Sequence, residues 1–420
     1  MSDQPATAPH HRLRAMVGRP TDEPHRASTP LELLFDLTIV VAFAQAGAQL
    51  AHLLQTEHTG AAIGAFAFAV FGICWAWINY SWLASAFDND DVIFRLATMV
   101  QMVGVLVLAL GLPQLFASIG TGAPLDNSVL VAGYVIMRLS TIGLWLRVAR
   151  HNRRWRRTAG TYAALIAVAQ VGWIVQIVIF PSITVTVIIT VVLALFEVSI
   201  PMIAERIEAT PWHPHHVAER YSLLVIITLG EVIAGTITEI GAVHEKQGWS
   251  LEAGLVALGG VALALGLWWV YFTMPSGDVL AQHRERSFVW GYGHMVLFGA
   301  LAASGAGLHV AAFVIQGEAS IGPTAAALTL AVPVAIFTFF LFVLYSLLLG
   351  ELDTFHLLLL LGALLVLAAA VGAVAVGASL GVGTLITACS MLVVVVGYET
   401  VGHRHQDQAL RRALQPPAEQ

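Results

Sequence analysis

Twelve long apolar segments dominate the sequence, and each is long enough to cross a bilayer as a helix. A helix rises about 1.5 Å per residue, so roughly 20 residues span about 30 Å of hydrocarbon. The segments lie at 31–54, 60–84, 92–116, 128–149, 159–179, 182–205, 217–240, 252–274, 288–312, 323–349, 354–376 and 378–400. Only 11% of the residues are charged, against about a quarter in soluble proteins. We therefore predict an all-α, polytopic integral membrane protein of about 12 transmembrane helices.

Two boundaries between segments are weakly marked, which leaves eleven spans as an alternative. Pro181 alone separates the fifth segment from the sixth, and the stretch GASLGVG separates the last two. An odd number of spans would place the two termini on opposite sides of the membrane.

The arginines favour twelve spans and one orientation. With a cytoplasmic amino terminus, twelve spans place 16 arginines inside, while the outer loops hold only Lys246. Cytoplasmic loops of membrane proteins are enriched in Lys and Arg. We therefore expect both termini in the cytoplasm. The basic stretch RVARHNRRWRR lies beside the membrane and is expected to contact anionic lipid headgroups, and the net charge of -6 gives no indication of nucleic-acid binding.

Similar features recur about 190 residues apart, which suggests an internal repeat. The matching pairs, with their separations, are Trp75 and Trp268 (193), Asp88 and Asp278 (190), and Glu32 and Glu219 (187). We predict a flexible cytoplasmic tail at 1–29, a first six-helix half at 30–206, a second half at 207–402 in the same orientation, and a cytoplasmic tail at 403–420. Transporters are known with two such halves related by an axis along the membrane normal. The alternative is chance similarity among apolar helices.

Several acids lie inside the predicted spans, where a charge near hydrocarbon is costly unless it faces protein or water. Helical spacing places Glu32 and Asp36, at the start of the first span, about 40° apart on one face. Glu231 lies about 21 Å along its helix, beyond the predicted midplane and far from either helix end. An ionised Glu231 needs a cation or several donors, and a protonated one can carry a proton. Glu231 is therefore the leading candidate for a proton, ion or substrate pathway.

The other candidates for this pathway are cations, further acids and one histidine. Arg95 lies at the same depth as Glu32 and Asp36, and Arg138 is placed to pair with Glu231 or Glu197. The remaining candidates are Glu219, Arg220 and His294, whose imidazole could relay protons.

Each candidate also has a purely structural alternative. Glu32, Asp36 and Glu219 lie at helix starts, where a carboxylate caps free N–H groups and complements the helix dipole. The arginines could form ion pairs that serve assembly alone, and His294 could be a hydrogen-bonded core residue. The acidic turn at 88–91 is expected to be solvated. The two cysteines have no CxxC spacing, so no metal site, disulfide or cofactor is indicated.

Two motifs in combination, PLELLFDLTIVVAFAQ and HHVAERYSLLVIITLGEVI, resemble the bacterial low temperature requirement protein A family. FRLATMVQMVGVLVLAL, which contains Arg95, and YGHMVLFGAL, which contains His294, also resemble the family's pattern. The resemblance covers roughly 28–400. It implies a multi-pass protein of the bacterial cytoplasmic membrane, from a family named for a requirement during growth in the cold. It supplies neither a substrate nor a catalytic residue.

The interior charges and the two expected halves favour a secondary transporter or proton-linked permease for an unknown small solute, working by alternating access. A membrane-embedded enzyme that modifies lipid is an alternative, because Asp, Glu and His near one leaflet can perform acid–base chemistry. A non-catalytic assembly or sensor protein is a third. The expected partners are membrane lipids and a small solute or proton, and the oligomeric state is left open.

Overall fold

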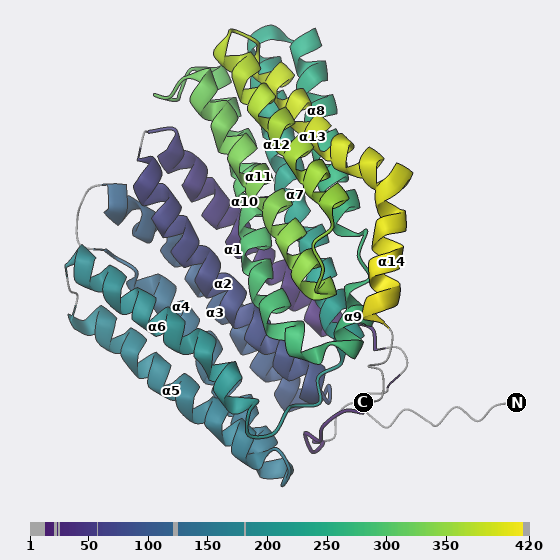
Figure 1. The fold of residues 1–420 in the computed structure, drawn as a ribbon. Helices are drawn as coiled ribbons and strands as arrows, with labels where there is room; N and C mark the ends of the chain where they lie inside the picture. The colour runs from purple at the N-terminus through teal and green to yellow at the C-terminus, as the bar shows by residue number, and fades with distance from the viewer. Residues whose placement is uncertain are drawn as a thin grey trace, which may run out of the picture. The chain divides into compact units, whose positions relative to one another are not determined.

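The computed structural model describes residues 13–20, 23, 26–56, 58–120, 125–179 and 182–414. All regular secondary structure in these ranges is helical, as predicted. In chain order the elements are α1 (Pro30–Leu54), α2 (Thr59–Phe87), α3 (Val92–Gly120), α4 (Ser128–His151), α5 (Arg156–Ile179), α6 (Ile183–Ala204), α7 (Pro214–Gln247), α8 (Leu251–Tyr271), α9 (Ser276–Gln282), η1 (Arg284–Arg286), α10 (Ser287–Gln316), α11 (Pro323–Leu349), α12 (Thr354–Ala375), α13 (Leu380–Gly397), η2 (Tyr398–Gly402) and α14 (His403–Ala413) (Figure 1).

Among the described residues, twelve helical segments are long and apolar enough to cross a membrane, which confirms the predicted number of spans. The weakly marked boundary between the last two spans lies where the sequence places it. Gly377 there adopts a left-handed backbone with φ 105°, and Ser379 caps α13 by accepting a hydrogen bond from the Val382 N–H at 3.3 Å. The other weak boundary, at Pro181, lies outside the described residues.

The chain divides into two compact units. Unit 1 contains the described residues of Met1–Ile39, Ala76–Gly111 and Pro124–His213, and unit 2 contains those of Val40–Trp75, Leu112–Ala123 and Pro214–Gln420. Their boundaries fall inside α1, α2 and α3, so they differ from the halves 30–206 and 207–402 that the sequence suggests. The relationship between two parallel six-helix halves stays a prediction.

Unit 1 is built around α3, α4, α5 and α6. In Figure 1, α5 and α6 lie side by side, and α4 packs against α5. The rings of Trp145 (α4) and Tyr162 (α5) stack with centroids 4.1 Å apart. A Cβ on Gly133 of α4 would lie 2.5 Å from the carbonyl oxygen of Gly104 on α3, so glycine allows these two backbones to approach closely.

Part of the segment 1–29, predicted as a flexible tail, contacts the helices of unit 1. Met16 is fully buried, and Arg26 is only 6% exposed. The backbone N–H of Arg19 donates to the carbonyl of Ala86 in α2 at 3.0 Å. Residues 1–12, 21, 22, 24 and 25 lie outside the described residues.

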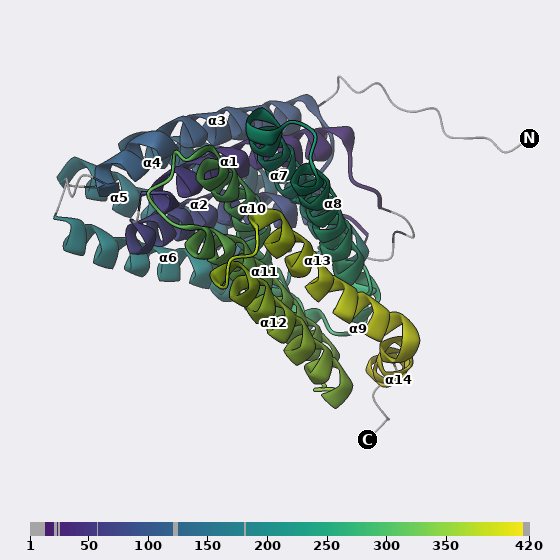
Figure 2. The same ribbon diagram turned by 90° about the horizontal axis from the view of Figure 1, so that it is seen from above.

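In unit 2, six helices pack in a closed sequence. Helix α7 contacts α8, α8 contacts α13, α13 contacts α12, α12 contacts α11, α11 contacts α10, and α10 contacts α7. Seen from above, α11, α12 and α13 follow one another (Figure 2). Helices α7 and α10 approach closely at Gly235 and Gly305. A Cβ at either position would lie 2.6 Å from a carbonyl oxygen of the other helix, so glycine allows this approach.

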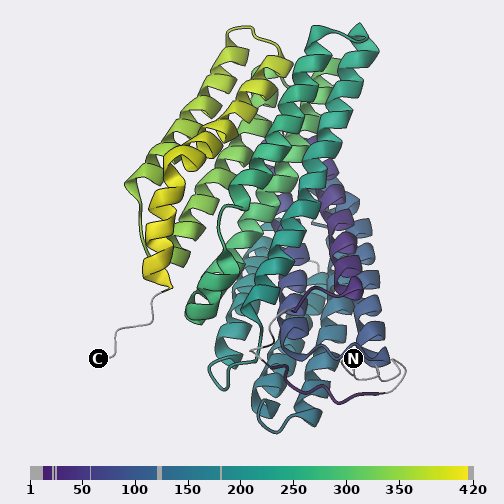
Figure 3. The ribbon, with the colours of Figure 1, turned by 90° about the vertical axis from the view of Figure 1, so that its right-hand side faces the viewer.

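The last span continues into a helix that the sequence analysis does not predict. The π-helix η2 joins α13 to the polar helix α14, and Figure 3 shows the bend between them. Helix α14 occupies the first part of the predicted tail 403–420. Gln406 in α14 donates to the carbonyl of Thr273 at 2.6 Å, and Arg412 forms an ion pair with Glu351 at 2.9 Å.

Candidate functional site

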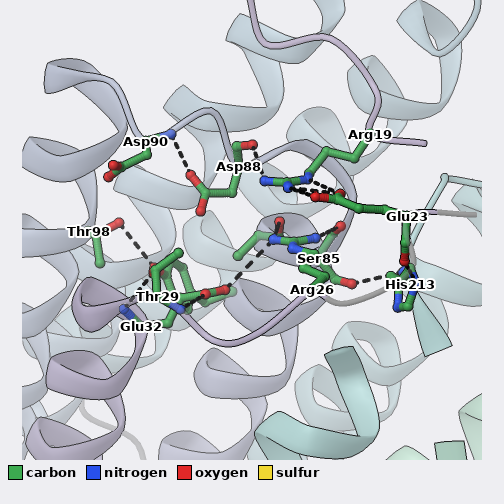
Figure 4. A network of polar contacts seen from close by, with 12 residues as sticks. Arg19, Glu23, Arg26, Thr29, Glu32, Ser85, Asp88, Asp90, Thr98 and His213 are labelled. Carbon is green, nitrogen blue, oxygen red and sulfur yellow. Dashed lines mark hydrogen bonds and ion pairs between the residues drawn. The ribbon is translucent and has the colours of Figure 1, made fainter. Parts of the chain in front are cut away.

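A network of polar side chains surrounds the start of α1 in unit 1 (Figure 4). Thr29 and Glu32 cap the helix reciprocally. The Thr29 hydroxyl accepts from the Glu32 N–H at 3.3 Å, and the Glu32 carboxylate accepts from the Thr29 N–H at 2.8 Å. This arrangement is a capping box, which satisfies two backbone donors that the helix itself leaves unpaired. Glu32 thus makes the helix-capping contacts that the sequence analysis gives as its purely structural alternative.

Arg26 joins this cap to the end of α2, as Figure 4 shows. Its guanidinium donates to the carbonyl oxygens of Ala84, at 2.6 Å, and Ser85, and lies 4.0 Å from the Glu32 carboxylate. Burial lowers the pKa of Arg26 to about 10, although the charge of Glu32 opposes this. A cation at these last carbonyls also complements the dipole of α2.

Asp88 lies in the acidic turn between α2 and α3, and it is buried. The prediction that this turn is solvated is wrong for Asp88, which is 5% exposed. The Arg19 guanidinium donates to the Asp88 carbonyl oxygen at 3.4 Å (Figure 4). Its carboxylate accepts the N–H of Asp90 at 2.7 Å. Burial, followed by the negative charge of Glu32, raises the pKa of Asp88 to about 6.

Asp91, in the same turn, is 1% exposed, so the prediction is wrong for this residue too. Arg147 of α4 binds its carboxylate with both terminal guanidinium nitrogens, one of them at 2.8 Å. The N–H groups of Phe94, at 2.9 Å, and Arg14, at 3.0 Å, donate to it as well. Burial alone raises the pKa of Asp91, but these donors outweigh it and hold the pKa well below its usual range. Asp91 therefore ties α3 to α4 and to the N-terminal segment.

Asp36, the second acid of α1, is fully buried, and the indole N–H of Trp77 donates to it at 2.6 Å. Arg95 does not supply its counter-charge. The Arg95 guanidinium forms two hydrogen bonds with Asp90, at 2.7 and 2.8 Å, and its side chain is 41% exposed. The predicted depth of Arg95 therefore does not bring it to either acid of α1.

Arg138 and Glu197 form an ion pair inside unit 1. Glu197 is one of the two partners that the sequence suggests for Arg138. Nη2 of Arg138 lies 2.6 Å from the Glu197 carboxylate, and both side chains are completely buried. The amide of Gln170 donates to the other carboxylate oxygen at 3.0 Å, and the guanidinium lies 5.7 Å from the centre of the Tyr134 ring. Helices α4, α5 and α6 are joined by this cluster.

In unit 2, His294 of α10 is 1% exposed and lies among aromatic rings. Its Nε2 is 3.0 Å from the hydroxyl of Tyr271, at the end of α8, and its Nδ1 is 2.7 Å from the carbonyl of Trp290. Glu219 of α7 lines a nearby cavity of about 280 Å³ that Tyr271 also lines. Arg220, the next residue of α7, is fully buried.

Glu231 lies further along α7 and is half-buried. It belongs to unit 2. Of the two partners that the sequence suggests for Arg138, Glu231 and Glu197, the structure pairs Arg138 with Glu197. The backbone of Glu231 faces Gly305 of α10, where a Cβ would lie 2.6 Å from the Glu231 carbonyl oxygen.

Sequence reasoning missed Glu239, two turns beyond Glu231 on α7. Glu239 is fully buried, and the hydroxyl of Thr384 in α13 donates to its Oε1 at 3.4 Å. Its Oε2 has no hydrogen-bond partner among the described residues. A signal was present, because Glu239 lies eleven residues after Thr228, about 20° away around the helix, on the face that also carries Gly235.

Within unit 1, Arg138 joins Glu197, and Glu32 joins Arg26 near Asp88. In the part of the chain that the structure describes, no group of three or more His, Cys, Asp or Glu is arranged to hold a metal ion.

Comparison with known proteins adds a family relationship. A family model described as bacterial low temperature requirement A protein (LtrA) matches residues 27–396. An uncharacterized protein of Rhizobium meliloti (strain 1021) is similar, with 25% identity over 301 residues, which cover 67% of this chain and 68% of that protein. No solved structure matches the chain. The family match begins just before α1 and ends within α13, so it includes every cluster described above except the contacts of residues 13–26.

Proposed function

We propose that this chain, which belongs to the bacterial low temperature requirement A family, is a proton-linked secondary transporter of a small solute. We place it in the bacterial cytoplasmic membrane with both termini in the cytoplasm, where its arginine-rich loops contact anionic lipid headgroups. Alternating access between two arrangements of the helices would move solute and proton together.

The observation that carries this proposal is the buried carboxyl group of Glu239. An ionised carboxylate inside a membrane protein needs a cation or several hydrogen-bond donors. Among the described residues Glu239 has one donor, the Thr384 hydroxyl at 3.4 Å, and its second oxygen has none. A group with so few donors is suited to take up and release a proton. Glu231, eight residues earlier and about 12 Å away along α7, supplies a second carboxyl group toward the middle of the helix.

The test is transport by the purified protein in lipid vesicles that contain a pH-sensitive dye. A panel of amino acids, sugars, nucleosides, polyamines and organic cations is added outside under an imposed pH gradient. The proposal expects at least one compound to change the lumenal pH in vesicles that contain the protein. Glu239→Gln should abolish that change, while Glu245→Gln, on the exposed side of α7, should retain it.

Two results would contradict the proposal. If no compound changes the lumenal pH, proton-linked transport of these solute classes is rejected. If Glu239→Gln folds and transports normally, the proton site lies elsewhere, and Glu231→Gln is the next variant to measure.

A role in assembly alone is the second candidate, and the closed pair of Arg138 and Glu197 favours it. An ion pair without exposure can hold helices together without any transport. Under that function, replacing both partners by apolar residues leaves the cellular role intact, and the vesicles show no solute-dependent pH change.

A further inference from the structure

The hydrogen bonds of His294 define where its ring carries its proton. The carbonyl of Trp290, 2.7 Å from Nδ1, can only accept, so Nδ1 carries the hydrogen. In the neutral ring Nε2 is then an acceptor, and it accepts from the hydroxyl of Tyr271 at 3.0 Å. Since the side chain is 1% exposed, it has almost no direct contact with solvent.

Tyr271 and a second hydroxyl group, that of Ser222, line one cavity. Because the single hydroxyl hydrogen of Tyr271 is directed at Nε2, the Tyr271 oxygen can only accept from Ser222. Hydrogen bonds through these groups therefore run in one direction, from Ser222 through Tyr271 to His294. The hydroxyl of Tyr345 donates to the backbone carbonyl of Tyr271 and holds the end of α8 in place.

The outer end of this chain reaches a cavity of about 280 Å³ that both Ser222 and Tyr271 line. Three titratable side chains, His215, Glu219 and Asp278, line the same cavity. His215 and Asp278 are about half exposed, at 54% and 56%, and lie 3.8 Å apart. At roughly 30 Å³ per molecule, the cavity has room for several waters beside Ser222.

We propose that Ser222, Tyr271 and His294 form a proton relay from this cavity into the interior of unit 2. This proposal rests on the proposed proton-linked transport. A hydronium ion in the cavity gives a proton to the Ser222 oxygen and becomes water as the Ser222 hydrogen passes to the Tyr271 oxygen. The Tyr271 hydrogen passes at the same time to Nε2 of His294. Each oxygen of the relay gains one hydrogen and loses one, no electrons change hands, and the positive charge ends on the imidazolium.

Burial disfavours a charged imidazole at His294, and the aromatic rings around it offset part of that cost. The centroids of the Trp290 and Tyr221 rings lie 4.3 and 4.9 Å from that of the imidazole. Aromatic faces attract a cation within about 6 Å. The titratable side chains that face the ring are the phenols of Tyr221 from α7 and Tyr271 from α8, and the Trp290 carbonyl continues to accept the Nδ1 hydrogen.

The first test is the rate of lumenal pH change in the vesicle assay, with the panel compound that gives the largest signal. Tyr271→Phe keeps the ring and removes the relaying hydroxyl, and Ser222→Ala removes the preceding one. Each should slow the pH change on the order of tenfold or more. The matched control is Tyr162→Phe, which removes a buried hydroxyl that donates to Glu205 at 2.9 Å in unit 1. It should keep the original rate.

The second test does not depend on transport. In ¹⁵N NMR spectra of protein labelled in its histidine rings, the His294 signal is identified by its loss in His294→Gln. The relay requires the Nδ1–H tautomer at neutral pH, with an Nε2 signal that shifts in Tyr271→Phe and not in Tyr162→Phe. An Nε2–H tautomer would overturn the relay even if the vesicles transport.

The two proposals can fail separately. Normal transport rates in both Tyr271→Phe and Ser222→Ala overturn the relay and leave proton-linked transport standing. Absence of any solute-dependent pH change in the unaltered protein overturns both, and the NMR result then describes a static hydrogen-bond chain.

Discussion

Asp88 should make the stability of the protein depend on pH, and Asp88→Asn should remove most of that dependence. Burial, aided by the negative charge of Glu32, raises the pKa of Asp88 from 3.8 to about 6, and the attraction of Arg26 offsets only part of this. The folded state therefore binds the proton more tightly than the unfolded chain does. Stability from this group is fully present below about pH 4 and is lost as the pH rises through about 6. At about 1.36 kcal/mol per unit of pKa, the full loss is about 3 kcal/mol.

Asparagine is a suitable replacement because it keeps the oxygen that accepts the Asp90 N–H at 2.7 Å, without the charge. The assay is thermal unfolding of purified protein in detergent between about pH 4 and pH 7.5. At pH 7.5, Asp88→Asn should be more stable than the unaltered protein by up to about 3 kcal/mol, and the difference should shrink toward pH 4. Asp407→Asn, at an exposed site in α14, is the control. An equal pH slope in Asp88→Asn and the unaltered protein would refute the reasoning.

Two further predictions concern packing inside each unit. Arg138→Met leaves the Glu197 carboxylate buried without its cation and should lower the free energy of unfolding in detergent by about 3–5 kcal/mol. Addition of Glu197→Leu should restore most of this loss. A double variant as unstable as the single one would contradict the prediction. Gly305→Ala places a Cβ 2.6 Å from the Glu231 carbonyl oxygen and should destabilise the contact of α7 with α10, which lowers the melting temperature. The control is Gly372→Ala, whose Cβ would have nothing within 4 Å. Its melting temperature should be unchanged or higher.

The spans and the family could be predicted because each leaves a continuous signal in the sequence. A chain in lipid must satisfy its backbone hydrogen bonds internally, so every long apolar segment becomes a helix. Helix ends are less regular. The segment 217–240 lies within the longer helix Pro214–Gln247, because polar residues at both ends continue the helix beyond the apolar stretch.

Partners were harder to predict, because a sequence gives the depth of a residue along a helix but not the direction in which its neighbours lie. The sequence indicates Glu231 or Glu197 as the partner of Arg138, and the structure joins Arg138 to Glu197. Arg95 has the predicted depth of Asp36 and yet binds Asp90, three residues after α2 ends, since its flexible side chain reaches the local acidic turn first. The burial of Asp91 depends on Arg147, 56 residues away, which no local pattern indicates.

The number of donors around each carboxylate, rather than its depth in the membrane, separates structural acids from candidates for proton transfer. Asp91 is held by a guanidinium and two backbone N–H groups, and Glu197 by a guanidinium and an amide. Donors of this kind favour the charged form of a carboxylate in general. Glu239 is equally buried but has one long hydrogen bond among the described residues. A change of its protonation disturbs fewer contacts than a change at Asp91 or Glu197, which is why we propose Glu239 as the proton-carrying group.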